Sequence, residues 1–163
     1  MIPRIMGKSA GSRHTAAASL CGSKNRWTLV ILSPGSRHLA AGVMVLLLSG
    51  GANRYGLSIP HDEEFREQDI DAEAGICLKE AIKAPEPLRV YQLAAVNAAS
   101  AIHHGPFNRV GETYETLLRW IEENGYHKAG PTRELFLHVS IPVTREDPSN
   151  VTEIQVPLEK TAV

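Results

Sequence analysis

An amphipathic helix around residues 110–121 constrains this chain more than any other feature of its sequence. Its apolar residues recur at the three- and four-residue spacings that place side chains on one helical face, and they are Val110, Tyr114, Leu117, Leu118 and Ile121. Gly105-Pro106 precludes an earlier start, Asn108 is placed to cap the first turn, and Asn124-Gly125 supplies the left-handed residue that commonly ends a helix. The pattern therefore predicts a helix with one buried face.

Alternating and β-branched segments predict strands on both sides of this helix. They are Trp27–Leu32, Leu57–Pro60, Asp71–Leu78, Leu88–Leu93, Asn97–His103, Arg133–Pro142 and Val151–Pro157. The last two would form a hairpin around the polar loop Thr144–Asn150. The residues His38–Leu48 form a predicted further helix that is apolar on all sides. Such a helix must be buried, or it exposes an aggregation-prone apolar surface.

An internal repeat organises these elements. Asp71–Leu78 aligns with Val151–Leu158 at a spacing of 80 residues, and the alignment matches Glu73 with Glu153. Strands precede both segments at similar places. The sequence therefore predicts an α+β fold of two β-α-β-β repeats, the first strongly degraded, with a groove between them that suits a ligand.

Charge divides the chain near Asp62. No Asp or Glu precedes that residue, and the seven basic residues before it leave ten for the remainder, which holds all 18 acidic residues. Such asymmetry is typical of a nucleic-acid or membrane-binding arm, a targeting extension, or a segment foreign to the fold. Residues 1–26 are rich in Gly and Ser without periodicity, which predicts disorder. The apolar run 39–48 is too short to span a membrane.

Cysteine and histidine spacing gives no support for a metal or cofactor site. Cys21 and Cys77 form neither a disulfide framework nor a zinc motif, and the apolar neighbours of Cys77 predict a buried thiol. His103 and His104 are adjacent on a predicted strand and so point in opposite directions. We expect a reducing, cytoplasmic environment and no cofactor.

The strand around Glu134 carries the candidate chemistry. Strand alternation places Glu134 and Phe136 on one face, and Leu135 and Leu137 on the other. With the leucines packed under the helix, the carboxylate and the ring would face the groove. An apolar, aromatic-lined carboxylate favours an organic cation, and its burial should raise its pKa.

These polar and aromatic residues also fit structural roles that involve no ligand, such as surface ion pairing and core packing. Glu134 can pair with Arg133 or Lys128 at a sheet edge, where an ion pair contributes about 0–1 kcal/mol. Tyr91 and Tyr114 suit packing with a hydroxyl at the surface. Trp120 lies at the margin of the apolar stripe, where it can cap the core or reach the groove. No nucleophile elbow or Cys-His signature is present.

An ordered series of motifs resembles the GyrI-like effector-binding family, whose members have a SOUL-like fold. The motifs are His104-Gly105-Pro106-Phe107, Leu117-Leu118-Arg119-Trp120-Ile121, Asn124-Gly125-Tyr126, Gly130 to Leu137, and Thr152 to Pro157, with Pro60 to Glu73 resembling the end of a first repeat. The resemblance covers about residues 55–160 and leaves 1–54 as a basic, acid-free segment. The family is the ligand-sensing domain of many bacterial MerR- and AraC-type transcription regulators, and some members inhibit DNA gyrase.

The resemblance implies binding of a lipophilic, often cationic, small molecule, as in multidrug sensing. It places Glu134 in the ligand cleft, makes Trp120 a cleft-lining candidate beside Tyr114 and Tyr91, and puts Phe136 where the family usually has Tyr. That change argues against roles that need the phenolic hydroxyl. The chain has no helix-turn-helix signature for direct DNA binding.

Three functions follow as expectations. The first is a stand-alone effector-binding module that holds its ligand through Glu134. The second is a small hydrolase in which Glu134 acts as general base on water. The third is a protein-binding module, with a regulator or gyrase as partner, in which the acidic surface matters more than the cleft.

Overall fold

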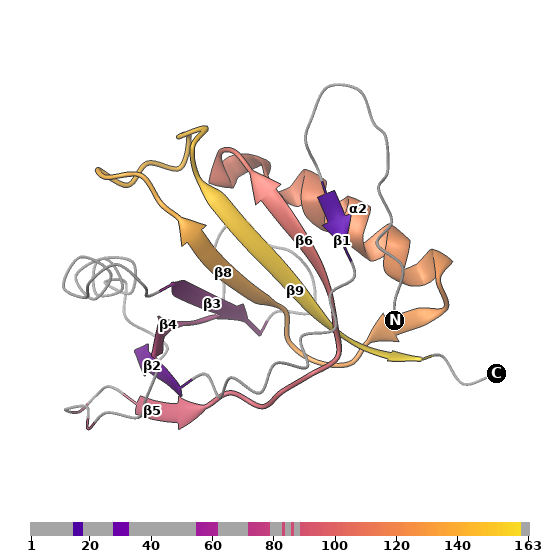
Figure 1. Cartoon of the computed structure of the whole chain (residues 1–163), viewed down its shortest axis with the longest axis horizontal. Helices are drawn as coiled ribbons and strands as arrows, with labels where there is room; N and C mark the ends of the chain where they lie inside the picture. The colour runs from indigo at the N-terminus through magenta and orange to yellow at the C-terminus, as the bar shows by residue number, and fades with distance from the viewer. Residues whose placement is uncertain are drawn as a thin grey trace. The chain divides into compact units, whose positions relative to one another are not determined.

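The chain divides into two compact units, seen in the computed structural model of Figure 1. Unit 1 comprises Met1–Gly22 and Val96–Val163, and unit 2 comprises Ser23–Ala95. Each unit is described by itself. The residues that the structure describes are 15–17, 28–32, 55–61, 72–78, 83, 86 and 89–160.

Unit 1 is built on an antiparallel sheet with the order β1-β6-β9-β8. Its strands are β1 (Thr15–Ala17), β6 (Ala98–His104), β8 (Arg133–His138) and β9 (Val151–Lys160). The short strand β7 (Tyr126–Lys128) pairs with the end of β9. The predicted hairpin of the last two long strands is confirmed, although β8 ends four residues earlier than expected and β9 continues three residues further.

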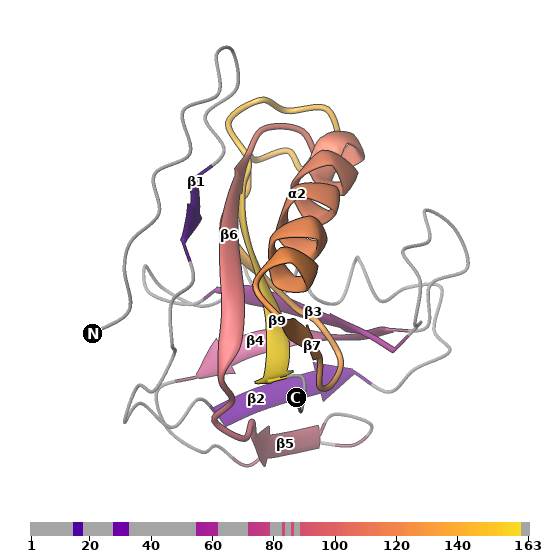
Figure 2. The ribbon, with the colours of Figure 1, turned by 90° about the vertical axis from the view of Figure 1, so that its right-hand side faces the viewer.

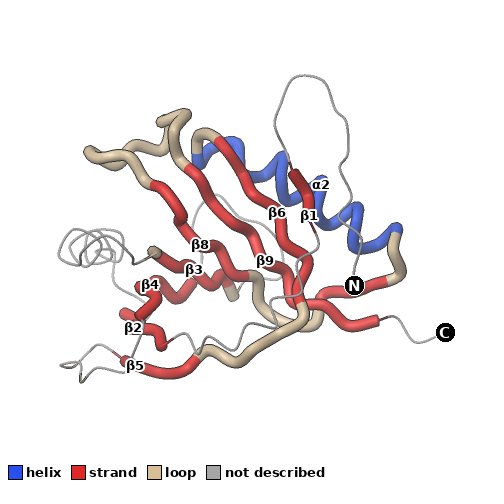
Figure 3. The backbone as a smooth tube through the Cα atoms, in the orientation of Figure 1, coloured by secondary structure: helices blue, strands red, loops and turns tan. Residues whose placement is uncertain are grey.

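The single α-helix among the described residues, α2 (Val110–Glu123), packs on this sheet beside β6 and β9 (Figure 2). Figure 3 shows the helix in blue along the red strands of unit 1. On β6 the residues in the core cluster are Ala99 and Ala101, whose short side chains let the helix approach the strand closely. This is the α+β architecture that the sequence predicts.

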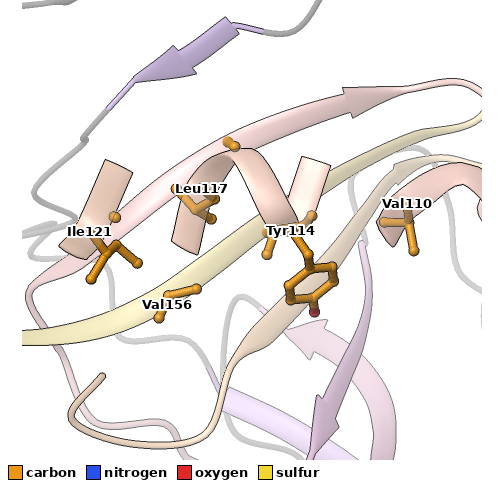
Figure 4. Packing of buried hydrophobic residues seen from close by; sticks show 8 residues of the cluster. Val110, Tyr114, Leu117, Ile121 and Val156 are labelled. Carbon is orange, nitrogen blue, oxygen red and sulfur yellow. The ribbon is translucent and has the colours of Figure 1, made fainter. Parts of the chain in front are cut away.

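The core of unit 1 lies between the helix and β6 and β9. Leu117 and Ile121 point from the helix toward Val156 of β9, while the ring of Tyr114 projects toward the sheet with its hydroxyl at the far end (Figure 4). Leu117 and Ile121 are 1% and 2% exposed, and Val156 is fully buried. Leu118, which the sequence assigned to the same stripe, is instead 41% exposed, because it lies at the edge of the apolar face.

The two ends of α2 differ in how well the sequence predicts them. Asn124 caps the C-terminus with its side chain donating to the Trp120 carbonyl, and Gly125 follows at φ 71°, as predicted. The predicted N-cap is wrong. The N-cap position is Arg109, because a 3-10 turn, η1 (Phe107–Arg109), leads into the helix and draws Asn108 into that turn.

Unit 2 contains an antiparallel sheet with the order β3-β4-β2-β5. Its strands are β2 (Thr28–Leu32), β3 (Gly56–Pro60), β4 (Ala72–Leu78) and β5 (Arg89–Gln92), each close to a predicted strand. Cys77 is a buried free thiol, as predicted, and its burial raises its pKa to about 11.

Two expectations for the N-terminal segment have different outcomes. The prediction of disorder over residues 1–26 is wrong at Thr15–Ala17, which pairs with β6 as strand β1. The apolar helix predicted at 38–48 lies outside the described residues. The boundary predicted between residues 54 and 55 stays a prediction. In the part of the chain that the structure describes, no helix has the length and apolarity that crossing a membrane requires.

The prediction that Leu135 and Leu137 of β8 pack under the helix is wrong, because the opposite face of the strand meets it. The register places Glu134 across from Ile154 of β9, a member of the core cluster under the helix. Directly opposed residues of an antiparallel pair point to the same side. Glu134 and Phe136 therefore lie on the helix side of the sheet, and Leu135 on the other. The alternation then breaks at a register shift between Phe136 and His138.

Candidate functional site

A hydrogen bond between the helix and strand β8 defines the candidate site. The Tyr114 hydroxyl donates to Glu134 Oε1 at 2.7 Å. Tyr114 belongs to the apolar stripe of α2 and is 8% exposed, so its ring is fixed by the core while its hydroxyl reaches β8. Packing of the helix on the sheet therefore positions both members of the pair.

Burial dominates the electrostatics of this pair. Burial raises the pKa of Glu134, and the hydrogen bond from Tyr114 offsets part of that rise by favouring the ionised carboxylate. The pKa of Tyr114 is raised far above its usual range, first by burial and then by the neighbouring carboxylate, so this phenol stays a hydrogen-bond donor. The predicted direction of the Glu134 shift is confirmed.

Glu134 keeps acceptor capacity beyond this bond. Among the described residues Tyr114 is its hydrogen-bond partner, through Oε1, and no basic side chain forms an ion pair with it. The alternative of a pair with Arg133 or Lys128 is therefore not what the structure contains. Arg133 lies on the opposite face of β8, because adjacent strand residues alternate. A partly buried carboxylate thus has one oxygen, Oε2, available to a ligand.

Two phenylalanines extend the site along the same side of β8. Phe136 and Phe107 pack edge to face, with ring centroids 5.6 Å apart and an interplanar angle of 78°. Phe107 comes from η1, at the start of the helix. Both rings are partly exposed. Since the faces of aromatic rings attract positive charge, they complement the carboxylate in recognising an organic cation.

Trp120 lies elsewhere on the helix. Its indole stacks on the ring of Tyr126 in β7, with centroids 6.3 Å apart and an interplanar angle of 11°. The two residues pack against the core cluster of unit 1. Trp120 follows Tyr114 by six positions, which is about 9 Å along a helix axis. Trp120 thus contributes to the core, as the ordinary interpretation of its position predicts.

Tyr91 belongs to unit 2 and forms a second tyrosine–glutamate pair there. Its hydroxyl donates to Glu73 Oε2 at 2.6 Å, and His61 Nε2 lies 2.9 Å from Glu73 Oε1. Tyr91 is 37% exposed. The structure therefore groups Tyr114, Glu134 and Phe136 in unit 1, and gives Tyr91 different partners.

The two adjacent histidines separate as strand geometry predicts. His103 is 2% exposed and uses both ring nitrogens, with Nδ1 at 2.8 Å from Thr113 Oγ1 and Nε2 at 3.0 Å from the Pro106 carbonyl oxygen. His104 is exposed. Within the described ranges, no group of three His, Cys, Asp or Glu side chains is arranged to hold a metal ion.

With this geometry in place, comparison with known proteins assigns the chain to a family. The family model of the GyrI-like small molecule binding domain matches residues 43–159. The chain belongs to the GyrI-like family. None of the curated proteins matches it in sequence.

Solved structures support the same fold. The chain is similar to EcmrR in a cryo-EM structure of an EcmrR–DNA complex, with a TM-score of 0.65 and 23% identity over 83% of this chain and 55% of that one. It also resembles the crystallised C-terminal domain of EcmrR, with a TM-score of 0.65 and 22% identity, covering 83% of this chain and 92% of that one. It thus spans about half of the longer EcmrR chain.

A third similar structure carries the name of an enzyme. A hydrolase from Listeria innocua aligns with a TM-score of 0.56 and 11% identity, over 82% of this chain and 87% of that one. At this identity the likeness extends to the fold alone. Structures similar in fold to this chain therefore include a DNA-bound protein and a protein named a hydrolase.

Sequence reasoning missed Phe107 as a member of the site in this GyrI-like domain. In the sequence it stands out only as the last residue of the motif His104-Gly105-Pro106-Phe107, yet it contributes the ring that packs on Phe136. A partial signal existed, since an aromatic residue just before an amphipathic helix is placed near the sheet that the helix covers. The partnership of Tyr114 with Glu134 had no local signal, because 20 residues separate them in sequence.

Proposed function

We propose that this GyrI-like domain binds a lipophilic organic cation, with Glu134 as the polar anchor. The observation that carries the proposal is a partly buried carboxylate that has a tyrosine donor on one oxygen and no cationic partner among the described residues. Such a group is costly to ionise until a cation neutralises it. A bound cation would therefore gain from an interaction that the protein does not satisfy internally.

The surroundings of Glu134 favour an aromatic or lipophilic ligand over a hydrated metal ion. Phe136 and Phe107 offer partly exposed ring faces on the same side of the sheet, and Ile154 lies directly across from Glu134. A small inorganic cation would need several oxygen ligands, whereas an organic cation needs one carboxylate and apolar contact. Membership of the GyrI-like small molecule binding family supports a small-molecule ligand at this site.

A fluorescence titration with thioflavin T, a permanently cationic aromatic dye, tests the proposal. We expect Glu134→Gln to weaken binding by about thirtyfold, which corresponds to about 2 kcal/mol, because it removes one partner of a desolvated charge pair. The anionic dye 8-anilinonaphthalene-1-sulfonate should bind Glu134→Gln at least as well as the wild type.

Glu115→Gln is the matched control. It removes the same charge from an exposed position on α2 and should change thioflavin T affinity less than twofold. Equal affinity of the wild type and Glu134→Gln for the cation would contradict the proposal. So would an equal loss in Glu115→Gln, since that would indicate a general effect of net charge.

One observation favours a second candidate, a hydrolase with Glu134 as general base. The family's phenolic hydroxyl is absent at Phe136, but Tyr114 brings a hydroxyl to the same carboxylate from the helix. A raised carboxyl pKa suits general-base catalysis near neutral pH, and the phenol can donate to a developing negative charge. Turnover of an activated ester that both Glu134→Gln and Tyr114→Phe abolish would favour this candidate.

We also propose that the fold consists of two pseudo-symmetric repeats. Its support is the alignment of Glu73 in β4 with Glu153 in β9. Each of these carboxylates accepts side-chain hydrogen bonds, Glu73 from Tyr91 and Glu153 from Ser100 at 2.6 Å. A repeat ancestry predicts that the two strands carry equivalent polar positions.

A further inference from the structure

Thr152 has an unusual environment within unit 1. In the part of the chain that the structure describes, its Oγ1 is the only buried side-chain polar atom without a hydrogen-bond partner, and the residue is 1% exposed. Most buried hydroxyls are paired, because an unpaired one loses its hydration without compensation. A valine of nearly the same shape would avoid that loss, so the hydroxyl calls for another explanation.

The strand register places this hydroxyl beside the candidate site. Thr152 lies directly across from Phe136 on β8 and from His103 on β6. Opposed residues point to the same side of the sheet, so Thr152 lies on the helix side, with Phe136 as one neighbour and His103 as the other. Phe107 packs on Phe136, so the pair of phenylalanine rings begins next to Thr152.

The polar neighbour of Thr152 is already engaged. The Pro106 carbonyl oxygen can only accept, so His103 Nε2 donates to it, and His103 Nδ1 is hydrogen-bonded with Thr113 Oγ1 at 2.8 Å. The imidazole therefore has no ring nitrogen left for Thr152. Phe136, on the other side, offers no hydrogen-bonding group.

Thr152 and Glu134 are close enough to contact one ligand. Glu134 pairs with Ile154, and Phe136 pairs with Thr152, so Thr152 is the diagonal neighbour of Glu134 across β8 and β9. Diagonal neighbours of this kind lie about 7–8 Å apart. Both side chains point to the helix side. A cationic group at Glu134 and a polar group at Thr152 would thus lie within one small molecule.

We propose that Thr152 Oγ1 is a second polar contact of the Glu134 site and selects organic cations that carry an oxygen a few bonds from the charge. The preferred class is an aryl amino alcohol or amino ether, whose ring replaces part of the contact between Phe107 and Phe136 and whose oxygen bonds the threonine hydroxyl. Thr152 is a specificity-determining residue in this scheme, and the inference rests on the proposed cation-binding function.

A matched pair of ligands tests it by isothermal titration calorimetry. Benzyldimethyl(3-hydroxypropyl)ammonium carries the hydroxyl, and benzyl(butyl)dimethylammonium replaces it with a methyl group. The wild type should prefer the hydroxyl compound at least about threefold, the ratio that a net hydrogen bond of modest strength supplies. Thr152→Val should remove the preference, and Thr152→Ser, which keeps the hydroxyl, should retain it.

The outcomes separate this inference from the function on which it rests. A wild type without the preference, or a Thr152→Val protein that keeps it, would overturn the role of Thr152 alone. Failure of both compounds to bind the wild type, or binding that Glu134→Gln leaves unchanged, would overturn the proposed function and this inference with it.

Thermal unfolding without ligand gives a second test. Thr152→Val should unfold at the same or a higher temperature than the wild type, because it removes an unpaired hydroxyl. A lower unfolding temperature would indicate that the hydroxyl is satisfied within the protein, and would also overturn the inference.

Discussion

Both units hold a tyrosine hydroxyl that donates to a glutamate, and the two pairs differ in burial. In unit 1 Tyr114 donates to Glu134 at 2.7 Å, and in unit 2 Tyr91 donates to Glu73 at 2.6 Å. Tyr114 is 8% exposed and Tyr91 is 37% exposed. Glu73 also contacts the His61 ring, so both of its oxygens have partners. The same hydrogen bond therefore occurs once in a desolvated, unsatisfied setting and once in a solvated, satisfied one.

This contrast shows why pairing alone does not identify a site. A carboxylate whose two oxygens both have hydrogen-bond partners, like that of Glu73, gains little from a further cation, because the competing interactions are already good. A partly buried carboxylate with one donor gains more. Burial and unsatisfied acceptor capacity, rather than the tyrosine–glutamate bond itself, make the pair in unit 1 the candidate site.

The largest expected effect compares the two glutamates directly. In the thioflavin T titration, Glu134→Gln should weaken binding about thirtyfold, whereas Glu73→Gln should change it less than twofold, because both oxygens of Glu73 already have hydrogen-bond partners. Similar losses in the two variants would break the comparison. They would mean that the pair in unit 2 contributes to binding despite its exposure.

The second expected effect is on the pH dependence of cation binding. The ligand binds the ionised form of Glu134, whose pKa burial raises. Affinity should therefore fall about tenfold per pH unit below that raised pKa, beginning at a higher pH than the ordinary glutamate value of about 4.3. Thioflavin T keeps its charge throughout, so the titration reports the protein. A decline that persists unchanged in Glu134→Gln would assign it to another group.

Local pattern was enough to predict the helix and most strands. The positions of Val110, Tyr114, Leu117 and Ile121 fix the buried face of α2 whatever the rest of the fold does, and Gly125 fixes its end. The N-cap was missed because a 3-10 turn after Pro106 shifts the helix start by one residue. Strand β1 was missed because three residues carry too little pattern to recognise.

The site was only partly predictable because its assembly is tertiary. Alternation along β8 correctly grouped Glu134 with Phe136, but it cannot tell which face meets the helix. The pairing of Glu134 with Ile154 decides that, and it depends on the register of β9. The resemblance to the GyrI-like family favoured Glu134 over a surface ion pair. Its partner Tyr114 and the neighbouring Phe107 became clear only from the packing.

A third expected effect compares the two tyrosines by urea unfolding at neutral pH. Tyr114→Phe should lower the free energy of unfolding by about 1–2 kcal/mol, because a hydrogen bond to a charged, partly buried group is lost. Tyr91→Phe should change it by no more than about 0.5 kcal/mol, as is usual for exposed positions. Equal costs would show that exposure does not distinguish the hydroxyls of the two pairs.

The smallest expected effect is on the pH dependence of stability. The pKa of Glu134 is higher in the folded than in the unfolded protein, so the unfolded state releases its proton first as the pH rises. The stabilisation from the protonated carboxyl is present below the ordinary pKa and is lost as the pH rises through the folded one. The loss is about 1.4 kcal/mol for each unit by which the pKa is raised.

Urea unfolding at pH values from below the ordinary glutamate pKa to above the raised pKa of Glu134 should show the wild type losing stability relative to Glu134→Gln. Tyr114→Phe should lose more than the wild type, because the hydrogen bond that lowers the Glu134 pKa is gone. A wild type and a Glu134→Gln protein with parallel profiles would contradict the burial of this carboxylate, on which the contrast between the two units depends.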